Sequence, residues 1–305
     1  MSRLAGITAN PILTNFAQGA AQSAIKPVAD FLAPTVPVPT QIGRFKKYTD
    51  KHRFKIPNTI RGLGGKATRI GFDAADATYN CTPNALDFPI DNLEQLEEAQ
   101  LMNMAQYGAT LISDSASLAH ESLVLTTALA ALGGGTASDF GDDTIDPIAV
   151  IDGIILAVIK AAKNGAPVKV LIGTGAWKKI KNNKNVKSRI VVGARNGLVA
   201  PSIADLSALL FANPEVMMSL MVQDTAAEGV AENISFLLDT KVIVFAGQST
   251  PTTLDPSFMK TFRLNGAWMV PGSYVTEDQR GEVLKMDWSE DVQVTNATAG
   301  QLITT

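Results

Sequence analysis

The sequence predicts an α+β fold in which one unusually long helix follows an extended, charged segment and precedes a unit of alternating helices and strands. Three observations lead to this prediction. Apolar residues recur at helical spacing from about residue 91 to about residue 132 with no proline among them, and helical and strand-like patterns alternate over residues 146–256. Residues 257–305 are rich in short strand-like runs separated by turn signals.

The composition is that of a folded protein with a sizeable core. Hydrophobic residues make up 46% of the 305 residues and charged residues 18%, which excludes disorder of the whole chain. The net charge of −3 argues against a protein whose main affinity is for nucleic acid phosphates or an anionic membrane. A single cysteine, Cys81, excludes an intramolecular disulfide and a zinc site built on paired cysteines. The uncharged N-terminal run is interrupted by Pro, Asn, Gln and Thr, unlike a signal peptide, and the longest other uncharged run, "SLVLTTALAALGGGTAS", is too short and too rich in Ser, Thr and Gly to span a bilayer. We therefore expect a soluble protein made in the cytoplasm.

Residues 1–43 have the character of an extended arm. Their only charged side chains are those of Arg3, Lys26 and Asp30. The repeated prolines of "APTVPVPT" are incompatible with a helix and with a central strand, which leaves an extended segment or an edge strand. Such an arm folds poorly alone and is suited to lying on another surface.

Residues 44–90 are predicted to form a long, charged hairpin. Residues 41–70 carry nine basic side chains and one acidic one, whereas residues 71–98 carry seven acidic side chains and no basic one. The alternation in "RFKIP" and "TRIGFDAADATY" predicts two strands. Each charged block is consistent with a solvated face, but their adjacency indicates a loop that meets complementary charges on another copy. The basic side chains are those of Arg44, Lys46, Lys47, Lys51, Arg53, Lys55, Arg61, Lys66 and Arg69.

A long helix is predicted to begin at Asp91. Asp91 and Glu94 have the spacing of a capping box, and Glu97 and Glu98 suit the positive end of a helix dipole. A helix of about 40 residues would be about 55–60 Å long, which exceeds an ordinary globular helix. Residues 99–138 contain two acids and no Lys or Arg, so we expect this spine helix to be covered on most sides.

The following unit alternates helices and strands. Asp146 and Pro147 are predicted to open a second helix that ends at Asn164 and Gly165. Next come a strand in "VKVLIG", a basic helix in "AWKKIKNN", a strand near "SRIVVG" and a helix capped by Ser202. "EVMMSLMV" and "KVIVFA" are predicted as buried strands, and "SFMKTFRL", "WMVPGSY", "EVLKMDWSE", "DVQVTN" and "QLITT" as the closing ones.

The Gly65–Lys66 pair suggests a phosphate-binding loop but fits only part of its pattern. Ile60 stands where the first glycine belongs, and Ala67 replaces the hydroxyl that would bind the metal. The flanking segments also lack the preceding buried strand and the following helix. A nucleotide-binding enzyme therefore remains a remote alternative.

No group of residues indicates catalysis, a cofactor or a metal site. A Cys81–His120 dyad stays open, although isolated residues of these types are usually structural. Asp142 and Asp143 have no evident partner ligands. A basic cluster suits phosphate contacts, yet a solvated helix face is the better interpretation: Lys178, Lys179, Lys181, Lys184, Lys187 and Arg189. We expect a protein that is not an enzyme.

Two stretches resemble the tailed-bacteriophage major capsid proteins, which have the Hong Kong 97-like fold. "FLAPTVPVPTQIGRFKKYTDKHRFKIPNT" is similar to the family's junction between arm and loop, and "GGKATRIGFDAADATYNCTPNALDFPIDN" to its returning strand and acidic spine start. The similarity is most specific over residues 30–130, and "DPIAVIDGIILAV", "KVLIGTGAWKKIKNN" and "VTEDQRGEVLKMDWSEDVQV" continue it.

The resemblance implies a domain organisation for the chain. It assigns an N-terminal arm (1–43), an extended loop (44–90), a peripheral domain with the spine helix (91–145), an axial domain (146–256) and strands returning to the periphery (257–305). Lys66 lies in the loop through which some members crosslink, but no partner asparagine can be matched. The implied subunit-interface candidates are the nine basic residues above together with Asp91, Glu94, Glu97 and Glu98.

The resemblance also implies a function and partners. It implies a structural protein that self-assembles as hexamers and pentamers into an icosahedral shell around the double-stranded DNA of a phage, with no cofactor. Expected partners are further copies, a portal protein, and separate scaffolding or decoration proteins, with no sequence-specific DNA contact and no membrane. The location implied is the virion, after synthesis in the host cytoplasm. An encapsulin-type compartment that holds a protein cargo is the alternative with the same fold.

Overall fold

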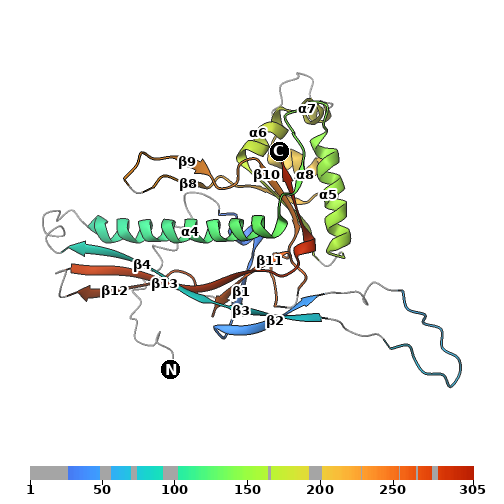
Figure 1. The fold of residues 1–305 in the computed structure, drawn as a ribbon, viewed down its shortest axis with the longest axis horizontal. Helices are drawn as coiled ribbons and strands as arrows, with labels where there is room; N and C mark the ends of the chain where they lie inside the picture. Colours follow the sequence, from blue (N-terminus) through green and yellow to red (C-terminus); the bar gives the residue numbers. More distant parts are fainter. Residues whose placement is uncertain are drawn as a thin grey trace.

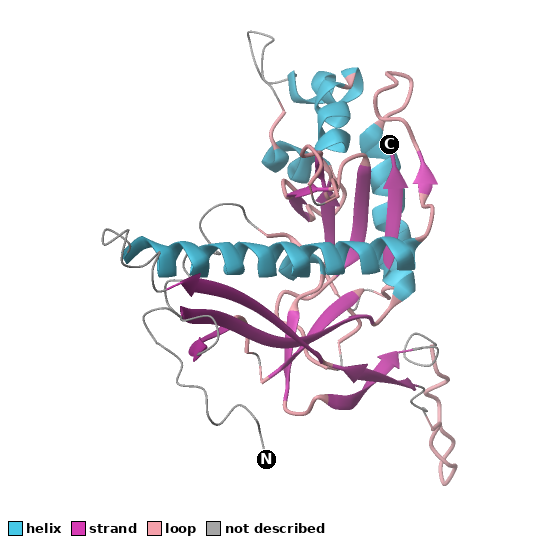
Figure 2. Ribbon diagram, turned by 60° about the vertical axis from the view of Figure 1, so that its left-hand side comes forward, coloured by secondary structure: helices cyan, strands magenta, loops and turns pink. Residues whose placement is uncertain are grey.

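The computed structural model describes residues 27–48, 56–69, 74–91, 102–163, 166–191, 201–227, 229–253, 255–265, 267–276 and 281–305. The fold is organised around helix α4 (Met102–Leu132), which lies along one sheet and reaches a second sheet at its C-terminal end (Figure 1). In the turned view the first sheet lies on one side of α4, and the second sheet with its helices lies on the other (Figure 2). The predicted α+β class is thus confirmed.

The first sheet is built on one long strand, β13 (Gly281–Val294), which pairs with three others. Its partners are all antiparallel to it: β4 (Thr82–Asp91), β11 (Met259–Leu264) and β12 (Val270–Thr276). Strand β1 (Thr35–Val38) pairs in parallel with β11 at the edge of the sheet. The edge position predicted from the prolines is therefore confirmed, since a proline there removes no ladder hydrogen bond from a central strand.

Helix α4 covers one face of this sheet because apolar residues alternate along β13. Leu284, Met286 and Trp288 are buried and form a cluster with Ile112 and Ala116 of α4. Close contact is possible because α4 carries a glycine, Gly108: a Cβ there would lie 2.5 Å from Phe88 Cδ1 of β4. The helix therefore rests on the sheet through small residues opposite large ones.

The start of the long helix differs from the prediction. Asp91, expected as the N-cap, is the last residue of β4 and pairs with Gly281 of β13. The neighbouring Ile90 is buried beneath α4, so the strand ladder extends through this position instead of giving way to a helix cap. Glu94, Glu97 and Glu98 lie outside the described residues. The described helix has 31 residues, or about 46 Å at ~1.5 Å per residue.

By length and composition, α4 also meets the requirements for a membrane-spanning helix. This is weak support for a span, because the core helix of a soluble protein passes the same test. Here α4 packs against β4 and β13 and carries a buried carboxylate, Glu121. Only 33% of its apolar stretch is buried, so the helix packs on the sheets along one face and is not covered on most sides as expected.

The second sheet holds the largest apolar cluster. Its strand order is β5 (Thr136–Ala137), β14 (Gly300–Thr304), β10 (Lys241–Ala246), β6 (Val168–Ile172) and β7 (Glu215–Met218). The buried strand predicted in "KVIVFA" is confirmed as β10, near the middle of the sheet. The last strand of the chain, β14, was expected to return to the first sheet. It pairs with β10 and β5 instead, so it belongs to the second sheet. Its Leu302 and Ile303 are buried in the larger cluster, which explains the placement.

Four helices and a short 3₁₀ turn surround this sheet: α5 (Pro147–Ala161), α6 (Thr174–Asn182), α7 (Lys184–Val191), α8 (Ile203–Leu209) and η2 (Ala297–Ala299). The predicted caps are confirmed: Asp146 accepts a hydrogen bond from the Ile148 amide at 3.1 Å, and Ser202 forms a capping box with Asp205. Asn164 and Gly165 lie outside the described residues.

Two strand predictions in this unit are wrong. The strand expected near "SRIVVG" is α7, because Val186 and Ile190 lie four residues apart on one helix face and pack on the core. "EVMMSLMV" is not one buried strand: β7 is a half-exposed edge, and Val222 begins the separate hairpin of β8 (Val222–Asp224) and β9 (Ile234–Phe236).

The charged segment leaves the body as an antiparallel pair, as predicted, but the pair ends at Asn80, and residues 82–90, expected in the same hairpin, belong to β4 of the first sheet. Strand β2 (Ile42–Tyr48) pairs with β3 (Ala74–Asn80). A small cluster fixes the base of this hairpin, in which Phe45 and Tyr79 each lie 4.9 Å from Phe262, measured between ring centroids. Beyond the two strands, the loop of residues 56–69 projects away from the body (Figure 1).

Candidate functional site

The projecting loop of residues 56–69 exposes large apolar side chains. Ile56 is 99% exposed, Ile60 87% and Leu63 108%. Apolar groups that are fully in water on a projecting segment favour a surface that another molecule covers. The loop is therefore a candidate interaction surface.

The loop is held by its own backbone. The Gly65 amide donates to the Gly62 carbonyl at 2.9 Å, and Gly64 has a φ of +79°, so the tip is a tight turn that uses glycine. Thr68 Oγ1 donates to the Asn58 carbonyl at 2.9 Å and joins the two arms of the loop. Residues 56–69 contain no helix or strand, so Gly65 and Lys66 do not stand at a helix N-terminus as a phosphate-binding loop requires.

The structure places the interface candidates in two distant regions. Arg61, Lys66 and Arg69 are exposed on the loop, and Arg44 and Lys47 are exposed on β2, the strand that also carries Lys46. Asp91 is exposed at the end of β4, which lies at the opposite end of the molecule from the loop (Figure 1). The remaining candidates lie outside the described residues: Lys51, Arg53, Lys55, Glu94, Glu97 and Glu98.

A cavity of about 440 Å³ opens beside the first sheet, where the chain turns from β11 to β12. Its apolar lining includes Pro83, Ala85, Leu264 and Val270. Lys285 and Asp287, which lie 3.6 Å apart as an ion pair, contribute polar groups, so the wall is apolar with a charged margin. No sequence signal identifies this cavity, because its walls come from segments far apart in the chain.

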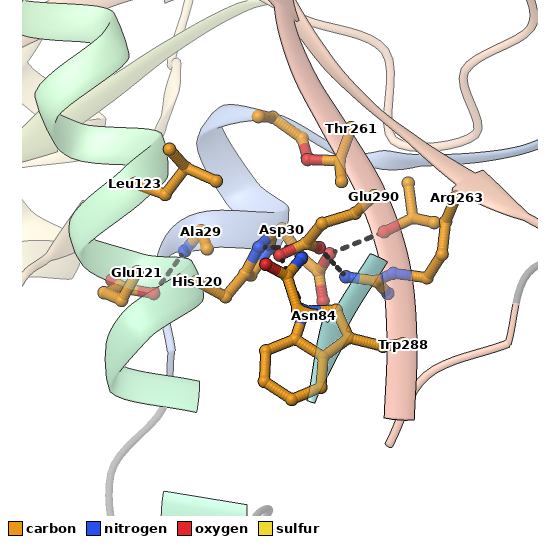
Figure 3. Close-up of polar contacts among 12 residues, drawn as sticks. Ala29, Asp30, Asn84, His120, Glu121, Leu123, Thr261, Arg263, Trp288 and Glu290 are labelled. Atoms are coloured by element: carbon orange, nitrogen blue, oxygen red, sulfur yellow. Dashed lines mark hydrogen bonds and ion pairs between the residues drawn. The ribbon is translucent and has the colours of Figure 1, made fainter. Parts of the chain in front are cut away.

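A buried polar cluster joins α4 to the first sheet. Figure 3 shows Glu290 of β13 between His120 of α4 and Arg263 of β11. His120 Nδ1 lies 3.0 Å from Glu290 Oε2, and Arg263 Nη2 donates to the same oxygen at 3.0 Å. Trp288 Nε1 donates to the other oxygen, Oε1, at 3.2 Å. Burial alone would raise the pKa of Glu290, but the hydrogen bonds and charges of His120 and Arg263 hold it below its usual value.

The next residue on α4, Glu121, holds the N-terminal segment. Its two oxygens accept hydrogen bonds from the Val28 amide at 2.9 Å and the Ala29 amide at 2.8 Å. These amides begin the short helix α2 (Ala29–Leu32). The Glu121 side chain is fully buried, and burial raises its pKa despite the two hydrogen bonds. The sequence gives one signal for this role of Glu121: it is one of only two acids in residues 99–138, which contain no Lys or Arg.

Cys81 and His120 do not form a nucleophile–base pair. The Cys81 Sγ contacts the Phe262 carbonyl at 3.5 Å, and the thiol is completely buried. Burial, aided by the charges of Asp291 and Glu290, raises its pKa to about 11, so the thiol stays protonated at neutral pH. His120 faces Glu290 instead, and the other histidine, His52, lies outside the described residues.

The acids of the glycine-rich loop before α5 form ion pairs and hydrogen bonds with neighbouring residues. Asp143 pairs with Lys184 at 2.7 Å, and Asp139 with Lys179 at 3.0 Å. Asp142 accepts a hydrogen bond from the Thr144 amide at 2.8 Å. Within the described part of the chain, no group of three or more His, Cys, Asp or Glu residues is placed to hold a metal ion. Arg189 pairs with Asp146, Lys178 and Lys187 are exposed, and Lys181 is half-exposed, so the basic cluster is partly neutralised and otherwise lies at the surface.

Comparison with known proteins shows a shared fold at low sequence identity. No protein-family model and no curated protein matches the chain. A phage-related protein from Bordetella bronchiseptica RB50 aligns over 98% of this chain and 97% of its own, with a TM-score of 0.72 and 18% identity. The SrpI encapsulin from Synechococcus elongatus PCC 7942 aligns over 93% and 88%, with a TM-score of 0.59 and 11% identity. The mature capsid protein of bacteriophage PhiM1 aligns over 92% and 87%, with a TM-score of 0.58 and 10% identity. The chain therefore shares its fold with these three proteins, two of which are described as an encapsulin and a phage capsid.

Proposed function

We propose that this chain is the major capsid protein of a tailed phage, a structural protein that assembles into an icosahedral shell around double-stranded DNA. The observation that carries the proposal is a projecting loop with three fully exposed aliphatic side chains, in a chain that shares nearly its whole fold with a phage capsid protein. A monomer gains nothing from exposing these groups to water. A shell in which each copy covers its neighbour's loop accounts for them.

The loop of one copy docks on the first sheet of the next copy. The cavity beside β12 and β13 has an apolar lining suited to Ile60 and Leu63. Because the loop and the cavity are different surfaces of one molecule, the contact is head to tail, and repeated rotation closes a ring.

The parts of the chain take the corresponding roles in the shell. The first sheet and α4 form the peripheral domain, and residues 146–256 form the axial domain around the five- and six-fold axes. Strand β14 is the exception, because it completes the axial sheet. A portal protein and separate scaffolding or decoration proteins complete the particle, and DNA is enclosed without sequence-specific contacts or a membrane. The role is structural and needs no cofactor, and the protein is located in the virion after synthesis in the host cytoplasm.

A disulfide-trapping experiment tests the docking directly. Leu63→Cys combined with Val270→Cys places one new thiol on the loop and the other at the cavity. Mild oxidation of assembled protein should give a ladder of covalent multimers, whereas Leu63→Cys alone should stay monomeric under denaturing electrophoresis. Cys81 is buried in both proteins and provides the same background. A double variant that assembles but gives no disulfide-linked multimers contradicts the proposed docking of the loop in the cavity.

An encapsulin-type compartment is the second candidate, because the chain shares its fold with an encapsulin to a similar degree. Particle content distinguishes the two. A phage shell made with its companion proteins should contain DNA, whereas an encapsulin should contain a protein cargo and little nucleic acid. The absorbance ratio at 260 and 280 nm of purified particles, together with their protein bands, decides between them.

A further inference from the structure

The hairpin of β8 and β9 turns its apolar face to solvent. In the strand register Val222 lies opposite Phe236, and Asp224 lies opposite Ile234, so these four side chains share one face. All four are exposed, Ile234 to 57% and Phe236 to 44%, whereas the side chains between them point the other way and are half-buried. In an antiparallel sheet the apolar face is normally the one that packs on the core. The reversed arrangement indicates a face that another surface covers.

The end of the hairpin is fixed by Asp224. Its Oδ1 accepts hydrogen bonds from the Ala226 amide and the Asn233 amide, both at 2.9 Å. The Thr225 amide donates to the Asn233 carbonyl at 3.0 Å and continues the ladder beyond the two strands. Val230, in the connection between the strands, is 66% exposed. The hairpin is thus preorganised, which lowers the entropy cost of docking.

A second exposed apolar surface lies beside helix α5. The Phe211 amide donates to Asp152 Oδ1 at 2.8 Å, which holds the segment after α8 against α5. Phe211 is 51% exposed, and Leu156, one turn after Asp152, is 42% exposed. Gly153 faces open space, since a Cβ there would meet nothing within 4 Å. We call Gly153, Leu156 and Phe211 the α5 patch.

The hairpin and the α5 patch lie on opposite sides of the second sheet. In Figure 1 the hairpin extends to the left of this sheet, and α5 stands to its right. The hairpin therefore reaches the α5 patch only of another copy. A contact between two different surfaces is heterologous, and it closes a ring when the rotation between copies closes.

The charges of the two surfaces are opposite in sign. Residues 219–240, which contain the hairpin, carry four acids and no Lys, Arg or His, and Glu232 is exposed on the hairpin. Lys160 of α5 and Lys187 of α7, the helix that packs beside α5, are exposed on the other side. Opposite charges steer two surfaces together. An acidic hairpin is repelled by nucleic acid phosphates, so a second copy fits it better than DNA does.

We propose that the β8–β9 hairpin of one copy docks on the α5 patch of the next copy around an axis of the shell, where Ile234 and Phe236 cover Leu156 and Phe211. The inference rests on the proposed function, because it needs copies arranged in a ring, but it involves neither the loop of residues 56–69 nor the cavity. Each copy is then joined to its neighbour at two places, once through the first sheet and once through the second.

Crosslinking between two kinds of copy tests the contact. One protein carries Val230→Cys and the other Leu156→Cys, and the two are mixed before assembly and treated with a short bis-maleimide. We expect adducts that contain one copy of each protein. In the control, Val275→Cys, exposed on β12 of the first sheet, replaces Leu156→Cys and should give no mixed adduct. Cys81 is buried in all of these proteins.

A substitution at Gly153 supplies the second test. Because a Cβ at this position meets nothing within a single copy, Gly153→Gln should fold as well as Gly153→Ala, but its longer side chain would stand in the contact. In light scattering, we expect Gly153→Gln to need a concentration about tenfold or more above that of Gly153→Ala to assemble.

The outcomes separate this contact from the function itself. Shells that form without mixed adducts, adducts of Val230→Cys with itself alone, or equal assembly of the two Gly153 variants overturn the inference and leave the proposed function intact. A wild-type chain that never assembles overturns the proposed function, and the inference with it.

Discussion

Replacing Glu121 tests how strongly the N-terminal segment is tied to α4. Glu121→Ala leaves the Val28 and Ala29 amides, bonded at 2.9 and 2.8 Å, without their acceptor. Each buried amide without an acceptor costs about 1–3 kcal/mol of stability. Removing the buried carboxylate offsets part of the cost of the two amides, so we expect the free energy of unfolding to fall by about 2–4 kcal/mol. Glu121→Gln keeps one acceptor and points an NH₂ group at the other amide, for a loss of about 1–2 kcal/mol.

Urea unfolding of unassembled protein, followed by circular dichroism, measures these losses. Asp114→Ala is the control, because Asp114 is an exposed acid on the same helix and should change stability by less than about 0.5 kcal/mol. The pKa of Glu121 is raised, so the folded chain binds its proton more tightly than the unfolded chain does. Wild-type stability should therefore fall as the pH rises above the ordinary carboxyl value, and Glu121→Gln should lack this component. A Glu121→Ala protein as stable as the Asp114→Ala control refutes the reasoning.

Three further predictions follow from single contacts. Gly108→Ala should lower the free energy of unfolding by about 1–3 kcal/mol, because the added Cβ would collide with Phe88. Gly153→Ala on α5 is the control: its Cβ meets nothing within 4 Å, so it should raise the free energy of unfolding by about 0.5–1 kcal/mol in the same urea assay. Cys81 should react with a thiol reagent only as fast as the protein opens, and rapid labelling of native protein would contradict its burial and raised pKa. Asn183→Ala should cost about 2–4 kcal/mol in thermal or urea unfolding, since its buried amide donates to three backbone carbonyls of the preceding loop, each at 3.1 Å; an unchanged midpoint would show that water replaces these bonds.

The features that sequence patterns predicted well are those determined by neighbours along the chain. The helical periodicity of α4 and the caps at Asp146 and Ser202 depend on residues close in sequence, whereas β2 and β3 were predicted from the alternation within each strand. The prolines of β1 also predicted its edge position.

The features that were missed depend on partners far along the chain. Asp91 has the residues of a helix cap nearby, but its pairing with Gly281 in β13 determines its conformation. "SRIVVG" has strand-forming composition, yet the core contacts of Val186 and Ile190 favour a helix. The cluster of His120, Arg263 and Glu290 joins three elements far apart in the sequence, so no local pattern could have predicted it.

The size of the purified product tests the central claim most directly. Light scattering with negative-stain imaging of the expressed chain, alone and with its neighbouring genes, reports whether it assembles. We expect closed shells or rings of five and six subunits, and we expect Ile60→Asp with Leu63→Asp to yield folded but unassembled protein. A wild-type chain that stays a well-behaved monomer or dimer under every condition would contradict the proposed role as a shell protein.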